Sequence, residues 1–242
     1  MNDPLKEEPK SGEGSRPSPD VNPESLEIIA VLFAGLLIIS NLASSRLVDL
    51  GPFSFDAGTL IFPLTYILGD VLTEVYGYAR SRRVIWVSFF SLLLCFLTLN
   101  LVSLIPGPGG ADADEAWSRA MTATPRIALG SLLAFASGEF LNAGILSRMK
   151  TRNPNKGPAG RFVASTLAGE GLDTLVFATV AFWGTLPWPL FLSLIISNYV
   201  FKCLMEIILL PLTLLSARAL KKARGADAAD GEISLSPFSW RI

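Results

Sequence analysis

Six apolar runs dominate this 242-residue chain. Each is long enough, at about 20 residues, for a helix to cross the hydrocarbon core of a bilayer. The runs are 26–45, 57–78, 84–105, 127–147, 162–183 and 189–216. Backbone polar groups in lipid must be bonded within the protein, so these runs predict helices rather than open strands. We therefore expect an all-α membrane protein with six transmembrane helices.

The composition agrees with this class and argues against most enzymes. Hydrophobic residues make up 50% of the chain and charged residues only 17%. The chain has no histidine, which excludes HExxH zinc sites and Ser-His-Asp triads. Cys95 and Cys203 lie within apolar runs, without the spacing of metal ligands. We expect no enzymatic activity, no cofactor and no bound metal.

Basic residues are distributed unevenly among the segments outside the apolar runs. Sixteen of the 20 lie in the two tails and in the second and fourth connections, against three in the remaining connections. The positive-inside rule therefore places both termini in the cytoplasm. We expect a disordered tail at 1–23, a transmembrane domain at 24–218 and a cytoplasmic tail at 219–242. The outer connection 106–125 has room for a short surface helix.

Seven ionisable side chains interrupt the predicted spans. They are Asp70, Glu74, Glu139, Glu170, Asp173, Lys202 and Glu206. Where two occur in one run they are three or four residues apart, so each pair lies on one helical face. A charge at the bilayer centre costs about 2.5–3.5 kcal/mol on insertion scales, so these groups must face one another or water. Six carboxylates outnumber one ammonium group, which predicts a polar central cavity open to a ligand or cation.

Small residues accompany these acids. The glycines Gly69, Gly138 and Gly169 directly precede Asp70, Glu139 and Glu170. A small residue beside an acid lets helices approach closely or leaves room for a ligand. Gly58 and Pro63 predict a kinked or re-entrant start to the second span. Glu74 lies late in an inward-running helix, so contact with cytoplasmic water stays open. Asn41, near the end of the first run, faces either a neighbouring helix or a ligand.

Three motifs resemble the queuosine precursor transporter family. They are AGTLIFPL at 57–64 followed by Asp70, Glu74 and Gly77, then GEGLDT at 169–174, and the Asn-x3-Lys-x3-Glu spacing at 198–206. The resemblance covers about 26–218 and leaves both tails outside it. It implies a six-span importer in the bacterial inner membrane. The implied substrates are 7-deazaguanines, such as 7-cyano- or 7-aminomethyl-7-deazaguanine, which are salvaged into the tRNA base queuosine.

This resemblance suggests roles for the polar and aromatic residues. A guanine-like ring offers adjacent N–H donors, and an ionised carboxylate can accept both. We expect Glu170 or Asp173 to bind this edge. Lys202 is expected to pair with Glu206 or a nearby acid, as a helix-register or coupling ion pair. Asp70 is either a ligand or a protonation switch. The predicted substrate-binding residues are Asn41, Phe62, Tyr66, Asp70, Glu139, Asn142, Glu170, Asp173 and Asn198.

Two other classes of protein stay open. One is a membrane subunit that captures substrate for a separate ATP-driven module, since this chain has no GxxxxGK[ST] loop of its own. The other is a cation or proton channel, because acidic side chains also line cation paths. The expected partners are a small nucleobase-like molecule and membrane lipid, and not nucleic acid. The sequence leaves open whether the protein forms a homodimer and what drives uptake.

Overall fold

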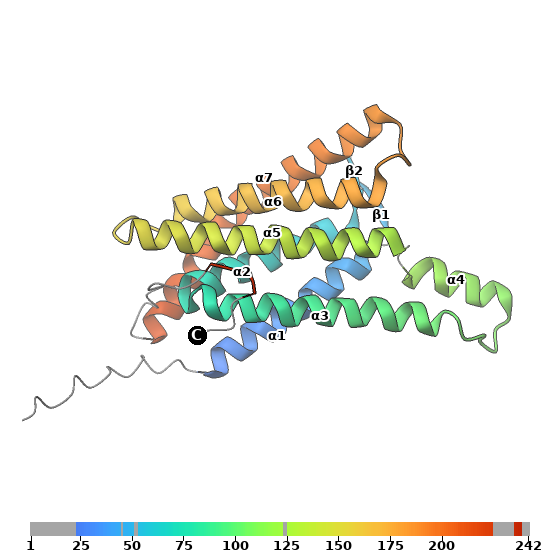
Figure 1. Cartoon of the computed structure of the whole chain (residues 1–242), viewed down its shortest axis with the longest axis horizontal. Coiled ribbons are helices and arrows are strands. Elements are labelled where there is room, and N and C mark those ends of the chain that lie inside the picture. Colours follow the sequence, from blue (N-terminus) through green and yellow to red (C-terminus); the bar gives the residue numbers. More distant parts are fainter. Residues whose placement is uncertain (1–22, 45, 51–52, 123–124, 225–234, 239–242) are drawn as a thin grey trace, which may run out of the picture.

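The computed structural model describes residues 23–44, 46–50, 53–122, 125–224 and 235–238, most of which lie in long helices (Figure 1). The helices are α1 Pro23–Ala43, α2 Phe62–Tyr76, α3 Tyr78–Val102, α4 Ala111–Met121, α5 Pro125–Arg152, α6 Ala159–Phe182 and α7 Trp188–Arg224. The predicted disordered tail 1–23 falls almost entirely outside the described residues. Helix α4 confirms the short surface helix expected within 106–125, and none of its residues is buried.

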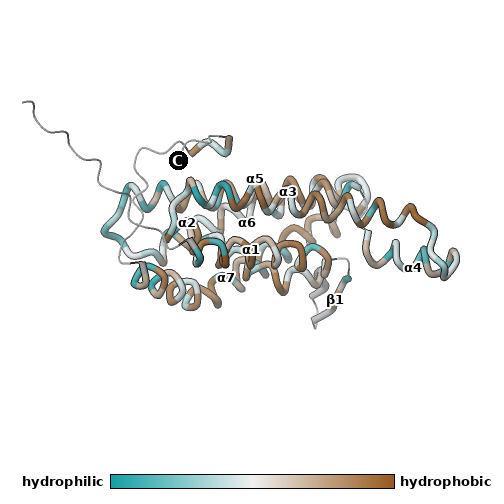
Figure 2. The backbone as a smooth tube through the Cα atoms, turned by 90° about the horizontal axis from the view of Figure 1, so that it is seen from below, coloured by the Kyte–Doolittle hydropathy of each residue, from teal (hydrophilic) through white to brown (hydrophobic). Residues whose placement is uncertain are grey.

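Among the residues that the structure describes, four helical stretches are long and apolar enough to cross a bilayer, judged by length and composition. They are α1, α3, the stretch Ala111–Arg152 that contains α5, and α7. Apolar residues make up much of α3 and α7, as the colouring of these helices in Figure 2 shows. Leu94 on α3 and Ile208 on α7, for example, are 64% and 66% exposed. Exposed apolar faces of this extent fit contact with lipid rather than water.

Helices α2 and α6 are not among these four. The 15 residues of α2 reach about 22 Å at about 1.5 Å per residue, less than the roughly 30 Å of a hydrocarbon core. Helix α6 is longer, but Glu170 and Asp173 lower its hydropathy. The six spans expected from the sequence therefore stay a prediction, and four are supported by length and composition.

The second predicted span, 57–78, is not one continuous helix. A 3-10 helix, η1, covers Ala57–Leu60, and α2 begins only at Phe62 with Pro63 in its first turn. Proline is tolerated there because the first amides of a helix have no partner within the helix. This break agrees with the kinked start that Gly58 and Pro63 predicted. It also explains why α2 is shorter than the apolar run.

A β-hairpin precedes η1, and the all-α prediction missed it. Strand β1 (Leu47–Leu50) pairs antiparallel with β2 (Phe53–Asp56), with Leu47 opposite Asp56 and Leu50 opposite Phe53. Strands of four residues carry too little alternation to be recognised from the sequence. The connection between the two strands, residues 51–52, lies outside the described residues.

A single residue, Gly77, joins α2 to α3. Its φ of 83° lies in the left-handed region, where a Cβ atom is disfavoured. Its amide donates to the carbonyl oxygen of Thr73 at 3.1 Å and so closes the end of α2. The predicted runs left a connection at 79–83, and these residues instead lie in the first turns of α3.

Part of the predicted C-terminal tail packs against α3. Three side chains of α3 donate to its carbonyl oxygens: Tyr78 to Leu235 (2.9 Å), Arg82 to Ser236 (3.0 Å) and Trp86 to Pro237 (2.9 Å). The ring of Trp86 also lies 5.7 Å from the ring of Phe238, measured between ring centroids. Helix α7 continues to Arg224, beyond the predicted domain end at 218. The stretch 235–238 is therefore bound to the helical domain and is not a free tail.

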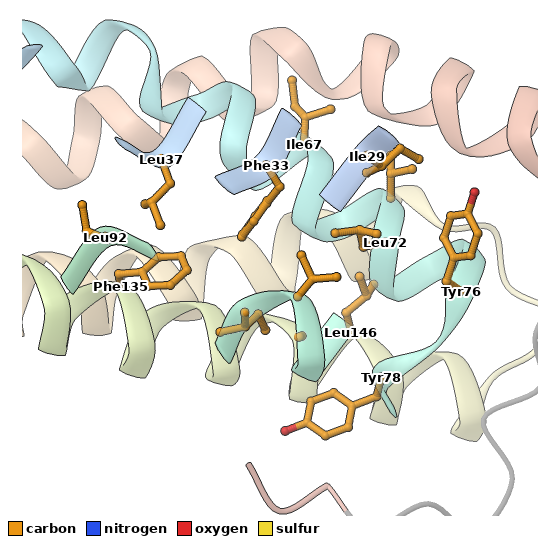
Figure 3. Close-up of a cluster of buried hydrophobic side chains, with 14 of the residues drawn as sticks. Ile29, Phe33, Leu37, Ile67, Leu72, Tyr76, Tyr78, Leu92, Phe135 and Leu146 are labelled. Atoms are coloured by element: carbon orange, nitrogen blue, oxygen red, sulfur yellow. The ribbon is translucent and has the colours of Figure 1, made fainter. Parts of the chain in front are cut away.

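The apolar core lies between α1, α2, α3 and α5 (Figure 3). Phe33 and Leu37 of α1 are fully buried, and the Phe33 ring lies 6.1 Å from that of Phe135 on α5. Leu72 of α2 and Leu92 of α3 complete the contact. Because this core occupies one side of the bundle, the polar faces of α2 and α5 turn toward α6 and α7.

Helices α5 and α6 approach each other at glycine residues. A Cβ atom added to Gly138 would lie 2.8 Å from Cβ of Asp173 and 3.0 Å from the carbonyl oxygen of Gly169. A Cβ atom added to Gly169 would lie 2.8 Å from Cβ of Asn142. A glycine beside an acid was expected either to let helices approach closely or to leave room for a ligand. At Gly138 and Gly169 the structure favours close helix approach. This contact fixes the acids of α6 against the amide of α5.

Replacing Gly138 by alanine should therefore destabilise the protein. We expect Gly138→Ala to cost about 1–3 kcal/mol, because the added methyl group forces the two helices apart. A Cβ atom at Gly144, on the same helix, meets nothing within 4 Å. Gly144→Ala should therefore be neutral, or stabilising by up to about 1 kcal/mol from helix propensity. Thermal unfolding of the purified variants in detergent measures both, and equal midpoints would contradict the close contact.

Candidate functional site

The polar stripes of α2, α5, α6 and α7 meet in the interior of the bundle. All of their ionisable groups are buried: Asp70 and Glu74 are 0% exposed, Glu139 and Glu170 2%, Glu206 3%, Asp173 5% and Lys202 9%. The prediction that these groups face one another is confirmed. In this conformation the cluster is closed to solvent, so the open cavity expected from the sequence stays a prediction.

Lys202 of α7 lies at the centre of this cluster. Its Nζ is 2.5 Å from Oδ2 of Asp173 and 3.0 Å from Oε2 of Glu170, both on α6. The same atom lies 4.1 Å from the centroid of the Phe62 ring on α2, a cation–π contact. One ammonium group thus connects three helices and shares its single positive charge between two carboxylates.

These contacts correct one of the expected ion pairs. The sequence paired Lys202 with Glu206 or a nearby acid, and the structure shows the nearby acids, Glu170 and Asp173. Glu206 takes part in none of the ion pairs of the described residues. The reason is geometric, because Glu170 and Asp173 are three residues apart and present both carboxylates across the interface.

A second group of polar contacts surrounds Asp70. Nδ2 of Asn142 on α5 donates to Oδ1 of Asp70 at 2.8 Å, and Oγ1 of Thr166 on α6 donates to Oδ2 at 3.5 Å. The prediction had singled out Asp70 and Asn142 but not Thr166. A signal for Thr166 was present, since it lies four residues before Glu170 and hence on the same face of α6.

Glu139 and Tyr66 fill the space between these two groups of contacts. Glu139 lies against Gly69, where an added Cβ atom would be 2.1 Å from Oε1 of the carboxylate. The hydroxyl group of Tyr66 lies 3.1 Å from the position that a Cβ atom on Gly138 would take. The rings of Tyr66 and Phe62 are 5.4 Å apart. Two aromatic rings therefore border the acids, and their predicted contact with a substrate stays a prediction.

Several buried polar atoms of this cluster have no hydrogen-bond partner among the described residues. They include Oε1 of Glu139, Oδ1 of Asn142, Oγ1 of Thr174 and both carboxylate oxygens of Glu206. Buried polar atoms are nearly always bonded, and each exception asks for an explanation. Atoms of this kind are available to a bound molecule or to a proton.

Three residues considered in the sequence lie apart from these contacts. The side-chain amide of Asn41 donates to the carbonyl oxygen of Leu37, one turn earlier on α1, at 2.9 Å. Phe135 packs against Phe33 in the apolar core. Asn198 is half-buried on α7, one turn before Lys202. The roles assigned to Asn41 and Asn198 stay predictions.

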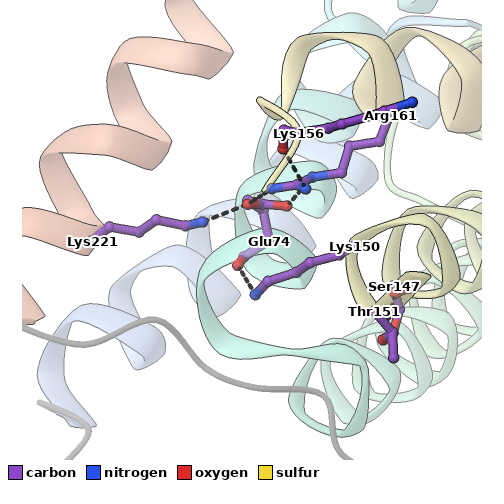
Figure 4. A network of polar contacts seen from close by, with 7 residues as sticks. All are labelled: Glu74, Ser147, Lys150, Thr151, Lys156, Arg161 and Lys221. Carbon is purple, nitrogen blue, oxygen red and sulfur yellow. Dashed lines mark hydrogen bonds and ion pairs between the residues drawn. The ribbon is translucent and has the colours of Figure 1, made fainter. Parts of the chain in front are cut away.

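Glu74 does not contact water, contrary to the option left open for it. Arg161 of α6 donates to both of its carboxylate oxygens, Nε to Oε2 at 2.9 Å and Nη2 to Oε1, and Lys221 of α7 also binds Oε1 (Figure 4). Lys150 of α5 donates to the backbone carbonyl oxygen of Glu74 at 2.7 Å. Sequence reasoning missed these partners because it assigned Arg161 and Lys221 to a connection and a tail.

A buried, partly neutralised polar cluster inside helices with lipid-facing apolar surfaces is typical of membrane transport proteins. Comparisons with known proteins define the family. The model of the putative vitamin uptake transporter family matches residues 56–216, which include every predicted site residue except Asn41. No solved structure matches the chain significantly.

Three relatives carry more specific names. A probable queuosine precursor transporter of Bacillus subtilis (strain 168) is 30% identical over 175 residues, which are 72% of this chain and 76% of the relative. The queuosine precursor transporter of Escherichia coli (strain K12) is 28% identical over 156 residues, 62% and 67% of the two chains. A probable queuosine precursor transporter of Haemophilus influenzae is 26% identical over 136 residues, 54% of each. The chain belongs to the queuosine precursor transporter family. Members of this family are multi-pass membrane transporters, and the chain is not an enzyme.

The buried Glu74–Arg161 pair should be important for stability. We expect Arg161→Ala to destabilise the protein by about 3–5 kcal/mol, because it removes a principal partner of a fully buried carboxylate. The matched control is Arg152→Ala, an exposed arginine at the end of α5, expected to change stability by less than about 0.5 kcal/mol. Chemical or thermal unfolding in detergent compares the two. Similar losses for both variants would show that the buried pair has no special role.

Proposed function

We propose that this protein imports queuosine precursors across the bacterial inner membrane, as a secondary transporter. The proposed substrates are 7-deazaguanines such as 7-cyano- or 7-aminomethyl-7-deazaguanine. The names of the three relatives support this substrate class. The observation that carries the proposal is the buried cluster of carboxylates, amide and aromatic rings contributed by α2, α5, α6 and α7.

The chemistry of this cluster suits a guanine-like ring. Such a ring has adjacent N–H donors on one edge, and a carboxylate is an acceptor with two oxygens. Glu170 and Asp173 supply such carboxylates, and Glu139 and Asn142 have acceptor oxygens without partners among the described residues. The rings of Phe62 and Tyr66 provide apolar faces for a flat ligand. The substrate would thus be bound by its edge and by its face.

Lys202 has a definite place in this proposal. In the closed conformation its ammonium group occupies the oxygens that would accept the N–H donors of the substrate. A neutral base that binds Glu170 or Asp173 must share or displace this ammonium group. Because Lys202 belongs to α7 and the acids belong to α6, binding would alter the contact between these two helices. Such a change is what an alternating-access transporter requires.

The proposed topology has six spans and both termini in the cytoplasm. The start of α1 lies beside the end of α2, where the hydroxyl groups of Ser25 and Tyr76 are 2.8 Å apart. The basic residues that surround Glu74 come from the end of α5, the start of α6 and the end of α7. One end of the bundle is thus rich in positive charge, which supports placing that end in the cytoplasm.

Uptake of labelled 7-cyano-7-deazaguanine by a host unable to make queuosine precursors tests the proposal. We expect Glu170→Ala, Asp173→Ala and Glu139→Ala each to lower uptake about tenfold or more, since a hydrogen bond to a charged group contributes about 1.5–3 kcal/mol. The matched control is Glu115→Ala, an exposed acid on α4, which should leave uptake unchanged.

The results separate the site from the function. If the wild type takes up the precursor and all three variants are fully active at normal protein levels, the substrate binds elsewhere. A wild-type protein that restores no uptake of either precursor would contradict the proposed function. Uptake that needs a co-purifying ATPase would replace the secondary transporter by a subunit of an ATP-driven importer.

A further inference from the structure

The interior cluster holds more negative charge than its cation can balance. Glu74 has its own partners in Arg161 and Lys221. Lys202 is shared between Glu170 and Asp173. Among the described residues, this leaves three buried acids that take part in none of the ion pairs: Asp70, Glu139 and Glu206. An uncompensated ionised carboxylate inside a membrane protein is costly, so the closed conformation requires protons on part of this set.

Glu206 differs from the other two acids. Asp70 accepts hydrogen bonds from Asn142 and Thr166, which partly compensate an ionised carboxylate. Both carboxylate oxygens of Glu206 are fully buried and have no hydrogen-bond partner among the described residues, whereas for Glu139 this holds of Oε1. Glu206 is also buried, with an exposure of 3%. Of the three acids, Glu206 is therefore the one whose two oxygens are both enclosed and unbonded in the described part of the chain, which disfavours its ionised form while the bundle is closed.

Glu206 also borders a gap between two helices. It lines a small groove between α6 and α7 together with Val163, Thr166, Leu167, Cys203 and Ile207. Thr166 contacts this groove on one side and Asp70 on the other. The groove offers too few oxygen ligands for a metal ion, which takes about six. Within the described residues, no group of three or more histidine, cysteine or acidic side chains is placed to hold one. A proton is the cation that fits.

We propose that Glu206 is the proton-binding group that couples substrate uptake to the proton gradient. This inference rests on the proposed function. The charged and titratable groups that face Glu206 are Asp70 on α2, Tyr66 on the same helix, Glu139 on α5, Glu170 on α6, and Lys202 and Cys203 on α7. Three of these six groups are carboxyl groups and one is a cation, so burial, together with this excess of acids, favours the neutral carboxyl group as long as the cluster is closed.

The proton and the substrate then cross together. The closed, loaded carrier holds Glu206 as a carboxyl group. When the cytoplasmic side opens, the O–H bond of this carboxyl group breaks and its proton passes to water. Lys202, four residues earlier on the same face of α7, is then within reach to neutralise the ionised Glu206 while the empty carrier returns. No electron transfer or further reactant is needed.

Glu206→Gln tests this inference in proteoliposomes, because glutamine resembles the neutral carboxyl group and cannot release a proton. Wild-type protein should accumulate labelled 7-cyano-7-deazaguanine about tenfold for each pH unit across the membrane, if one proton accompanies each substrate. Glu206→Gln should still exchange labelled for unlabelled precursor but should not accumulate it. Glu206→Asp should keep accumulation, and Glu115→Gln on exposed α4 should behave as wild type.

A second readout follows the proton itself. Addition of precursor to wild-type proteoliposomes should make the external medium more alkaline, and this signal should be lost in Glu206→Gln. Accumulation or proton movement that persists in Glu206→Gln overturns the inference and leaves the proposed function intact. Uptake by the wild type that does not depend on the proton gradient also overturns the inference and leaves the proposed function intact. A wild-type protein that neither exchanges nor accumulates the precursor contradicts the proposed function itself.

Discussion

A carboxylate among lipid-facing helices is stable only where another group compensates its charge or a proton removes it. The buried acids of α2, α5, α6 and α7, which form one polar column through the bundle, meet that requirement in different ways. Glu74 is bound by Arg161 and Lys221, and Asp70 accepts bonds from neutral groups. Glu170 and Asp173 share Lys202. The arrangement of α2, α5, α6 and α7 follows from these pairings, because each one joins side chains from different helices.

Such pairings need helices that approach closely, and the glycines provide this. Gly138 and Gly169 bring the backbones of α5 and α6 into contact, which places Asn142 and Asp173 at fixed positions in one unit. Helix α7 is attached differently. Lys202 binds Glu170 and Asp173, and the Tyr199 hydroxyl donates to the carbonyl oxygen of Leu167 at 3.2 Å. The polar link between α6 and α7 is therefore the one that a substrate competing for these acids would loosen.

The sequence predicted the helical class, the polar stripes and their convergence, because periodicity determines which residues share a face. It did not predict the partners of the acids. Asp70/Glu74 and Lys202/Glu206 have the same four-residue spacing, yet Glu74 is fully paired and Glu206 is unpaired among the described residues. Spacing along one helix says nothing about what the neighbouring helix presents. The short hairpin and the shortened α2 were missed for a related reason, since hydropathy records apolar length and not backbone hydrogen bonding.

The difference between Glu74 and Glu206 also decides which acid can take part in a transport cycle. Glu74 is bound by cations from three helices, so its charge is held by fixed partners in the closed structure. Glu206 has the opposite environment, because ionisation rather than protonation is what the closed structure resists. A group that must gain and lose a proton once per cycle needs an environment that changes with conformation and needs a carboxylate that is not held in an ion pair. In the polar column, Glu206 meets both conditions and Glu74 meets neither.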